Sequence, residues 1–281
     1  MQLTMSDVSS LYESFNSEAS TYERRLGGST RRIIAYIISL LGELPDNPIF
    51  LDNACGPGFA TEALLKAYPN CHVHAADIAP SMIALVNNNV ILNNWADRVE
   101  IDIMDGINLS YPNNTFDVSI TNFGISLFSD PIAGAKEIHR TLKPGGKAAI
   151  TCWKDPPFSS LLHAVQSIIK PHTPPLIRPQ LEQWSHPKTM HNMLLAAGFQ
   201  HENIRIYEKE VMWWNRGVSE AARGFADHFF QVVGEEWGVC EKGRLCEVTE
   251  RLLRERGREF VVDKEGMVGC RLVAWVAIAV K

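Results

Sequence analysis

The sequence predicts an α/β fold built on a doubly wound sheet, and two observations carry this prediction. Short apolar, β-rich runs alternate with segments of helical periodicity between about residues 30 and 153. Such alternation is typical of parallel strands joined by crossover helices. A glycine-rich turn follows the first run, at the place where doubly wound sheets bind nucleosides.

The elements of the first half follow one another in a regular order. Apolar residues at helical spacing over 30–44 predict a helix that leads into the first strand. Pro144, Gly145 and Gly146 force a turn before the fifth strand. We expect strands at 48–51, 71–76, 99–104, 116–121 and 147–153, and helices at 30–44, 59–67, 81–95 and 132–142.

The texture of the sequence changes after residue 153. Frequent prolines predict a loop-rich excursion over 156–202, which includes a helix that ends at Gly198. Alternating apolar residues predict strands over 203–214 and 266–280, and the segment 219–260 between them has helical periodicity. Two late strands that bracket a helical insertion therefore complete the sheet.

The composition restricts the class of protein and its partners. With 46% hydrophobic residues among 281, the chain can bury a sizeable core, which excludes a disulfide-stapled mini-protein and a disordered chain. The net charge of −5 provides no positive field for a phosphate backbone or an anionic bilayer. We therefore expect neither nucleic acid nor a membrane as a partner.

The cysteines and the chain ends point to a cytoplasmic location. The six cysteines form no C-x-x-C pair and no Cys/His cluster with zinc spacing, so we expect free thiols and no metal site. The first residues lack the basic and apolar regions of a signal peptide. The longest apolar run, at 272–280, is too short to span a bilayer.

The glycine-rich turn at residues 50–60 differs from a dinucleotide fingerprint. Ala54 replaces the first glycine of that pattern, Pro57 removes a backbone N–H, and Thr61 replaces the last glycine. The carboxylate of Asp52 beside the turn would repel a pyrophosphate but suits a ligand with an ammonium group. The turn therefore predicts a cation-bearing nucleoside rather than NAD.

Two further carboxylates follow the next two predicted strands. Asp77 ends the second strand, 19 positions after Gly58, where an acidic group can accept both hydroxyls of a ribose. Asp105 and Gly106 follow the third strand and can recognise the amino group and a ring nitrogen of adenine. Each carboxylate alone is more often a helix cap or turn residue. Together at successive strand ends, they predict a binding site.

These motifs together resemble the class I S-adenosylmethionine-dependent methyltransferases. The resemblance covers roughly residues 20–155. Within the family, the motifs are most similar to the branch typified by ubiquinone and menaquinone biosynthesis enzymes and their fungal secondary-metabolism relatives. It rests on the turn, on Asp105-Gly106, and on the stretches at 77–82 (Asp-Ile-Ala-Pro-Ser-Met), 116–118 (Phe-Asp-Val), 142–147 (Leu-Lys-Pro-Gly-Gly-Lys) and 195–199 (Leu-Ala-Ala-Gly-Phe).

The resemblance implies a Rossmann-like, seven-stranded sheet whose last strand is antiparallel, with S-adenosylmethionine as the cofactor. It implies that Asp52 and the turn contact the methionine moiety, Asp77 the ribose, and Asp105 the adenine amino group. It also implies that Ile78 and Met82 lie against adenine. Ala54 stands where the family often has glycine, a mild change provided that φ stays negative there. The expected cofactor-binding residues are Asp52, Asn53, Ala54, Gly56, Gly58, Asp77, Ile78, Met82, Asp105, Gly106 and Asn122.

Aromatic residues mark the side where an acceptor would bind. An amphipathic helix near the N-terminus either packs on the core or, as the family implies, closes as a lid. Aromatic residues are more often core than pocket, but together these suggest an apolar acceptor. The candidate substrate-binding residues are Tyr12, Phe15, Tyr22, Trp153, Trp213 and Phe229.

The histidines supply only weak candidates for a general base. His163 and His228 fall in the acceptor-side segments and are the two candidate catalytic residues. No carboxylate cluster resembles the metal site of catechol-type methyltransferases.

We therefore expect an enzyme that methylates a heteroatom, oxygen or sulfur more than nitrogen, of a small apolar metabolite, mainly through proximity and orientation. A nucleotide-dependent oxidoreductase is disfavoured by Asp52 and the turn spacing, and a non-catalytic cofactor-binding relative stays open. We expect a single domain over 1–281, with a lid at 1–28, a cofactor-binding core at 30–155, the excursion at 156–202 and a helical cap insertion at 215–262.

Overall fold

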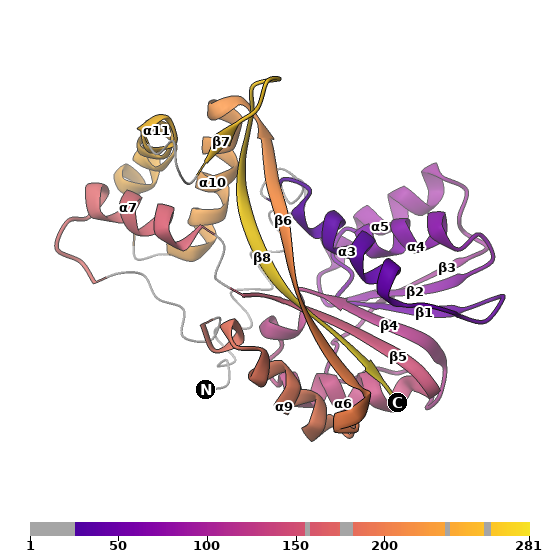
Figure 1. Ribbon diagram of the computed structural model, residues 1–281. Coiled ribbons are helices and arrows are strands. Elements are labelled where there is room, and N and C mark those ends of the chain that lie inside the picture. Colours follow the sequence, from indigo (N-terminus) through magenta and orange to yellow (C-terminus); the bar gives the residue numbers. More distant parts are fainter. Residues whose placement is uncertain (1–25, 155–157, 175–181, 234–236, 256–259) are drawn as a thin grey trace.

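A single twisted sheet runs through the molecule, with helices on both faces (Figure 1). The computed structural model describes residues 26–154, 158–174, 182–233, 237–255 and 260–281. The strand order is β3-β2-β1-β4-β5-β8-β6, and the short β7 pairs with β8. The strands are β1 (Ile49–Asn53), β2 (His72–Asp77), β3 (Val99–Ile103), β4 (Phe116–Asn122), β5 (Leu142–Trp153), β6 (Ile204–Arg216), β7 (Val261–Val262) and β8 (Met267–Val280).

The direction of the strands confirms the predicted topology. β1, β2, β3, β4 and β5 pair in parallel, whereas β8 runs antiparallel to both β5 and β6. Seven long strands with an antiparallel last strand were expected, and the two-residue β7 is an addition to them. Parallel strands bring their carboxyl ends to one edge of the sheet, which is called the carboxyl edge below.

Helices pack on the two faces of the sheet because successive strand residues point to opposite sides. Phe50 belongs to the same buried cluster as Ile33, whereas Leu51 belongs to the other cluster, with Ile138. Figure 1 shows the two layers. One face carries α3 (Ser29–Leu40), α4 (Phe59–Ala67) and α5 (Pro80–Leu92), and the other carries α6 (Pro131–Thr141) and α9 (Pro187–Ala197).

The fifth strand begins earlier than the sequence predicted. Leu142 already pairs with Phe116, and the register shifts between Phe116 and Val118, so the Pro-Gly-Gly turn lies within β5. A side chain at Gly146 would approach the carbonyl oxygen of Lys143 to 2.8 Å. The glycine therefore allows the chain to turn tightly against its neighbours and still enter the sheet.

A cap of helices lies at the end of a long two-stranded arm (Figure 1). β5 pairs with β8 only as far as Ala274, whereas β6 pairs with β8 to its beginning at Met267, so β6 and β8 extend beyond β5. α10 and α11 lie between β6 and β8 in the chain, which confirms the predicted helical insertion. The cap consists of α7 (Ser159–Ile169), α10 (Gly217–Val233) and α11 (Val239–Glu255).

Two details of this half differ from the expectation. The helical stretch expected over 219–260 is two helices, and the backbone N–H of Gly238 donates to the carboxylate of Glu241, which caps the start of α11. The excursion over 156–202 divides, because α7 packs on α11 in the cap while α9 packs beside α6 on the sheet. Within the described ranges, no helix is both long enough and apolar enough to cross a membrane.

Candidate functional site

The glycine-rich turn joins β1 to α4 at the carboxyl edge, as predicted. Gly56 and Gly58 both have positive φ, at 53° and 83°, a conformation that glycine adopts without strain. A side chain at Gly56 would meet no heavy atom within 4 Å, so the turn faces open space there. A ligand can therefore approach the backbone of this turn closely.

Ala54 departs from the expectation, because its φ is +55° rather than negative. This left-handed conformation costs roughly 1–2 kcal/mol for a residue with a Cβ atom. The Cβ of Ala54 lies against Gly124, where an added Cβ would come within 2.7 Å of it. Alanine in place of glycine was expected to be mild provided that φ stayed negative at this position, and that condition is not met. Gly124, which has no side chain, leaves the space that the Cβ of Ala54 occupies.

The carboxyl group of Asp52 caps the first turn of α4. Asp52 is 1% exposed, and its Oδ2 accepts hydrogen bonds from the backbone N–H and the hydroxyl of Thr61, at 2.9 and 2.7 Å. Thr61 is the third residue of α4, whose N-cap residue, Gly58, has no side chain to accept such a bond. Burial raises the pKa of Asp52 to about 7, and a cation nearby would favour its charged form.

Asp77 joins the turns that follow β1 and β2. Its Oδ2 accepts from the backbone N–H of Gly56 at 2.8 Å, and its Oδ1 accepts from that of Ala79 at 2.9 Å. Burial raises the pKa of this carboxyl. An ionised carboxylate has about four acceptor positions. Each oxygen of Asp77 therefore keeps capacity for a hydroxyl, as a ribose partner requires.

The third carboxylate, Asp105, is half-buried after β3, and its Oδ1 accepts from the backbone N–H of Ile107 at 3.1 Å. A side chain at Gly106 would lie 2.4 Å from Cζ of Phe128 and 2.9 Å from Oδ1 of Asn53. Packing against Phe128 is therefore a reason for this glycine that the sequence analysis missed.

The two residues expected against adenine lie in different environments. Ile78 follows β2 and is 41% exposed, whereas Met82 in the first turn of α5 is 1% exposed. Ile78 offers an apolar surface to a ligand at the carboxyl edge. Met82 supports that edge from the core.

Asn53 has an unsatisfied amide at the end of β1. It is 1% exposed, and its Nδ2 has no hydrogen-bond partner in the part of the chain that the structure describes. The hydroxyl of Thr121 on neighbouring β4 is likewise buried and unpaired there. Buried polar groups are nearly always hydrogen-bonded, so these two groups, together with the Asp77 carboxylate, fit a polar ligand at this edge.

An aromatic pair stands where β4 and β5 end. Phe123 follows Asn122 with a φ of 62°, and its ring stacks on Trp153 with centroids 4.0 Å apart and planes at 16°. The hydroxyl of Thr151 accepts from the backbone N–H of Phe123 and donates to Oδ1 of Asn122, both at 2.9 Å. The predicted Trp153 thus gains a partner, Phe123, that sequence reasoning missed because its signal is a backbone conformation.

The other predicted acceptor-side residues are not gathered at this edge. Trp213 on β6 and Phe229 on α10 are fully buried, and the ring of Trp213 stacks on that of Phe225 on α10 with centroids 4.4 Å apart. His163 is half-buried on α7. The expectations for Tyr12, Phe15, Tyr22 and the side chain of His228 lie outside the described residues. Among described side chains, no three or more His, Cys, Asp or Glu groups come together as metal ligands.

Comparison with known proteins indicates the class of enzyme. A demethylmenaquinone methyltransferase of Clavibacter sepedonicus is 28% identical over 231 residues, which cover 77% of this chain and 89% of that protein. The methyltransferase tpcH of Aspergillus fumigatus is 22% identical over 243 residues, covering 82% and 83%. The family described as "Methyltransferase domain" matches residues 50–146, which contain the turn, Asp77 and Asp105. The chain is an S-adenosylmethionine-dependent methyltransferase.

Further similarities bear on the fold and on the acceptor of this methyltransferase. A putative methyltransferase of Bacillus halodurans has the same fold, with a TM-score of 0.55 at 18% identity over 88% of this chain and 98% of that one. A ubiquinone/menaquinone biosynthesis C-methyltransferase of Hydrogenovibrio crunogenus is 33% identical over 116 residues, 41% of this chain and 45% of that protein. The relatives' names therefore do not agree on one acceptor.

Proposed function

We propose that this methyltransferase methylates an oxygen or sulfur atom of a small, apolar acceptor with a flat ring. The stacked pair of Phe123 and Trp153 carries the proposal, because it is an aromatic surface at the carboxyl ends of β4, the neighbour of β1, and of β5, the next strand in the sheet. Aromatic faces favour flat apolar partners. The next described helix after Trp153 is α7 of the cap, so an acceptor here would lie between the sheet and the cap.

We assign the cofactor to the carboxyl edge by the chemistry of its side chains. Asp77 would accept the two ribose hydroxyls, and Asp105 would accept the adenine amino group. Both hydrogen bonds from Thr61 go to Oδ2 of Asp52, so they leave the Oδ1 atom able to accept a bond from a ligand. Asp52 and the turn backbone would then receive the methionine moiety, with its ammonium group.

The chain would contribute mainly position and a dry site. S-adenosylmethionine supplies, when bound, an electrophilic methyl group. Methyl transfer is an in-line displacement, so holding the acceptor atom in line and excluding water lowers the barrier most. A thiol with a pKa near 8.5 or an acidic phenol ionises enough near neutral pH to react without a dedicated base.

The state of the cysteines bears on where the protein is located. All six cysteines are free, which fits the reducing cytoplasm that we propose as its location.

A carbon acceptor is the second candidate, because one relative is named a C-methyltransferase.

A methyl-transfer screen tests the proposal. Labelled S-adenosylmethionine is incubated with the protein and matched thiol, phenol, amine and quinol acceptors, and the product's NMR spectrum identifies the methylated atom. We expect O- or S-methyl products. A carbon-methylated quinol would replace the heteroatom assignment with the second candidate. If none of the acceptor classes yields a methylated product although S-adenosylhomocysteine binds in calorimetry, the protein is a non-catalytic relative.

A matched pair of variants tests the aromatic surface. Phe123→Leu keeps an apolar side chain of similar size but removes the ring, and we expect KM for aromatic acceptors to rise while the Kd of S-adenosylhomocysteine stays the same. Trp275→Phe is the control, since Trp275 donates to the carbonyl of Ser185 on the α9 side of the sheet. Equal KM values for Phe123→Leu and the wild type would show that this aromatic surface does not bind the acceptor, which contradicts the proposed acceptor class.

A further inference from the structure

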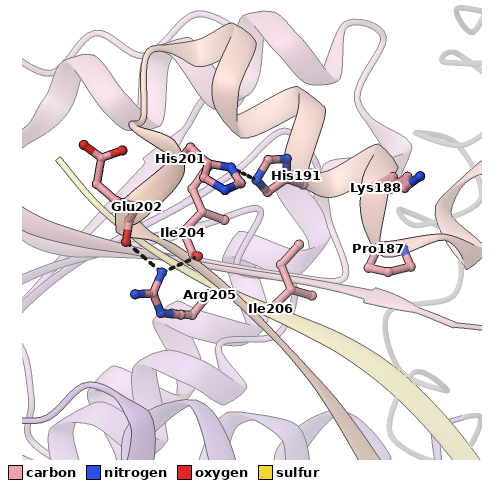
Figure 2. Close-up of a pocket in the computed structure, with 8 residues that line it drawn as sticks. All are labelled: Pro187, Lys188, His191, His201, Glu202, Ile204, Arg205 and Ile206. Carbon is pink, nitrogen blue, oxygen red and sulfur yellow. Dashed lines mark hydrogen bonds between the residues drawn. The ribbon is translucent and has the colours of Figure 1, made fainter.

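A pocket lies between α9 and the start of β6, away from the cofactor turn. Its volume is about 340 Å³, and Ile204 and Ile206 contribute to its lining (Figure 2). These residues pair with Ala279 and Ala277 of β8 and pack against the cluster on the α9 face of the sheet, whereas Trp153 packs against the cluster on the other face. The pocket and the aromatic pair therefore lie on opposite faces of the sheet.

Two histidine rings face one another in this pocket. The Nε2 atom of His191 and the Nδ1 atom of His201 are 3.0 Å apart, and the rings are 4.9 Å apart with planes at 77°. Figure 2 shows the two rings meeting across the space between α9 and the short helix η4 (His201–Asn203). The buried Met190 and Leu194 anchor α9 on the sheet, so the backbones that carry the two rings are fixed by packing.

The spacing of the two nitrogens matches a pair of metal ligands. Imidazole nitrogens bind Zn²⁺ at about 2.0–2.1 Å, and late first-row ions have similar bond lengths. Two such ligands at right angles around one ion are therefore about 3 Å apart. We propose that His191 and His201 together bind a divalent transition-metal ion of the Cu²⁺, Ni²⁺ and Zn²⁺ group.

The protons of the two rings allow the hydrogen bond between them to be replaced by two bonds to the metal ion without a co-reactant. In the neutral pair, one facing nitrogen carries a proton and donates it to the other. On binding the ion, that one proton moves through solvent to the outer nitrogen of its own ring, while the accepting ring already carries its proton on its outer nitrogen, so that both facing nitrogens offer lone pairs. No net proton is released from the neutral pair.

The charges around the pair set the kind of site. Figure 2 shows the Glu202 carboxylate pointing away from the facing nitrogens, while the guanidinium of Arg205 donates to the backbone carbonyls of Glu202 and Ile204. Lys188 adds positive charge to the lining. With two neutral ligands and no carboxylate, the remaining positions go to water in the pocket. Imidazole-preferring ions are then favoured over Mg²⁺ and Ca²⁺, which select oxygen ligands.

Calorimetry of the untagged full chain with NiCl₂ at pH 7.5 tests the site. His191→Gln and His201→Gln keep a hydrogen-bonding side chain but remove the imidazole, and we expect each to weaken binding roughly tenfold or more. His72→Gln is the matched control, because His72 is an exposed histidine at the start of β2. Equal affinity in the wild type and both pocket variants, or an equal loss in His72→Gln, would overturn the proposal.

Electron paramagnetic resonance of Cu²⁺ on the wild type tests it independently of how the variants fold. We expect coupling to two imidazole nitrogens and, in His201→Gln, to one. Coupling to fewer than two nitrogens in the wild type contradicts a two-histidine site. Because the pocket is separate from the cofactor turn, binding of S-adenosylhomocysteine should be unchanged by the metal.

Discussion

The carboxyl edge and the cap are held together by different forces. At the carboxyl edge, the side chains of Asp52 and Asp77 fix the turns through bonds to backbone N–H groups. In the cap, Phe225 and Phe229 are fully buried and stack on each other, and Phe225 also stacks on the buried Trp213 of β6. Directional bonds fix positions to fractions of an ångström, whereas apolar burial is roughly proportional to area and tolerates change in detail.

The difference assigns separate tasks to the two regions. A cofactor with fixed polar groups requires fixed partners, and in the proposed assignment the carboxyl edge would supply them. An apolar acceptor requires shape and dryness, which an aromatic cap on a long arm can supply. Changes in the cap should therefore affect stability and acceptor binding, whereas changes at the carboxyl edge should affect cofactor binding.

The largest expected effect comes from Phe225→Ala in the cap. Phe225 is fully buried and contacts Trp213, Phe158 and Phe260 through its ring. Removing such a ring costs about 3–5 kcal/mol of unfolding free energy, which urea unfolding measures. If the two regions are separable, S-adenosylhomocysteine binding stays close to wild type in native conditions. A loss of cofactor affinity larger than that in Phe199→Ala, a matched truncation in the α9 core, would show that the cap and the edge act as one.

Asp77→Ala makes the converse change at the carboxyl edge. We expect S-adenosylhomocysteine to bind about 2–4 kcal/mol more weakly in calorimetry, because a charged acceptor of two hydroxyls and the brace of Gly56 are both removed. Asp77→Asn retains one carbonyl acceptor, so it should lose less. Wild-type affinity in Asp77→Ala would remove this carboxylate from the cofactor site.

Asp52→Asn gives a pH signature of the buried carboxyl. Its pKa is raised from 3.8 to about 7 by burial, so the folded state binds more protons than the unfolded state between these values. The unfolding free energy of the ligand-free wild type therefore falls as pH rises, by about 2–3 kcal/mol from pH 5 to pH 8 through this group. The variant lacks this contribution, and urea unfolding at the two pH values should show a smaller fall. The same fall in both proteins would place the titration elsewhere.

Gly124→Ala tests the packing beneath the turn. Gly124 has φ −85°, which alanine adopts freely, so the 2.7 Å approach of the new Cβ to that of Ala54 is the source of strain. We expect a loss of about 1–3 kcal/mol of unfolding free energy. The loss should shrink in an Ala54→Gly background, which removes the opposing atom. Additive effects in the double variant would mean that the two residues do not oppose each other.

The sequence predicted the carboxyl edge more fully than the cap, and the reason is physical. A carboxylate or glycine at the end of a strand is a local signal, so Asp77, Asp105 and the turn were found from spacing alone. Trp213 and Phe229 were interpreted as pocket residues, but the structure buries both. Whether an aromatic residue faces a core or a pocket depends on elements distant in the chain, which its own neighbours do not specify.

Three features of the edge were beyond a residue pattern. The positive φ of Ala54 and of Phe123 is a property of the folded turns, since both residue types ordinarily avoid that region. The role of Gly124 depends on Ala54, 70 positions earlier, and appears only as a contact between them. The fold was more predictable than these details because the alternation of strands and helices repeats along the chain.

The smallest expected effect is that of His163→Ala, which tests whether the cap contributes a proton acceptor as well as an apolar surface. His163 is half-buried on α7, and at the carboxyl edge the pair of Phe123 and Trp153 offers no group that could orient an imidazole as a base. If an easily ionised acceptor reacts through position alone, kcat/KM falls by less than about tenfold, or about 1.4 kcal/mol, and the pH–rate profile follows the acceptor's own pKa. Steady-state kinetics with thiols of different acidity measure both quantities. A loss beyond about a thousandfold, with unchanged S-adenosylhomocysteine binding, would identify His163 as a general base. The cap would then carry chemistry, and the division of tasks between the two regions would no longer hold.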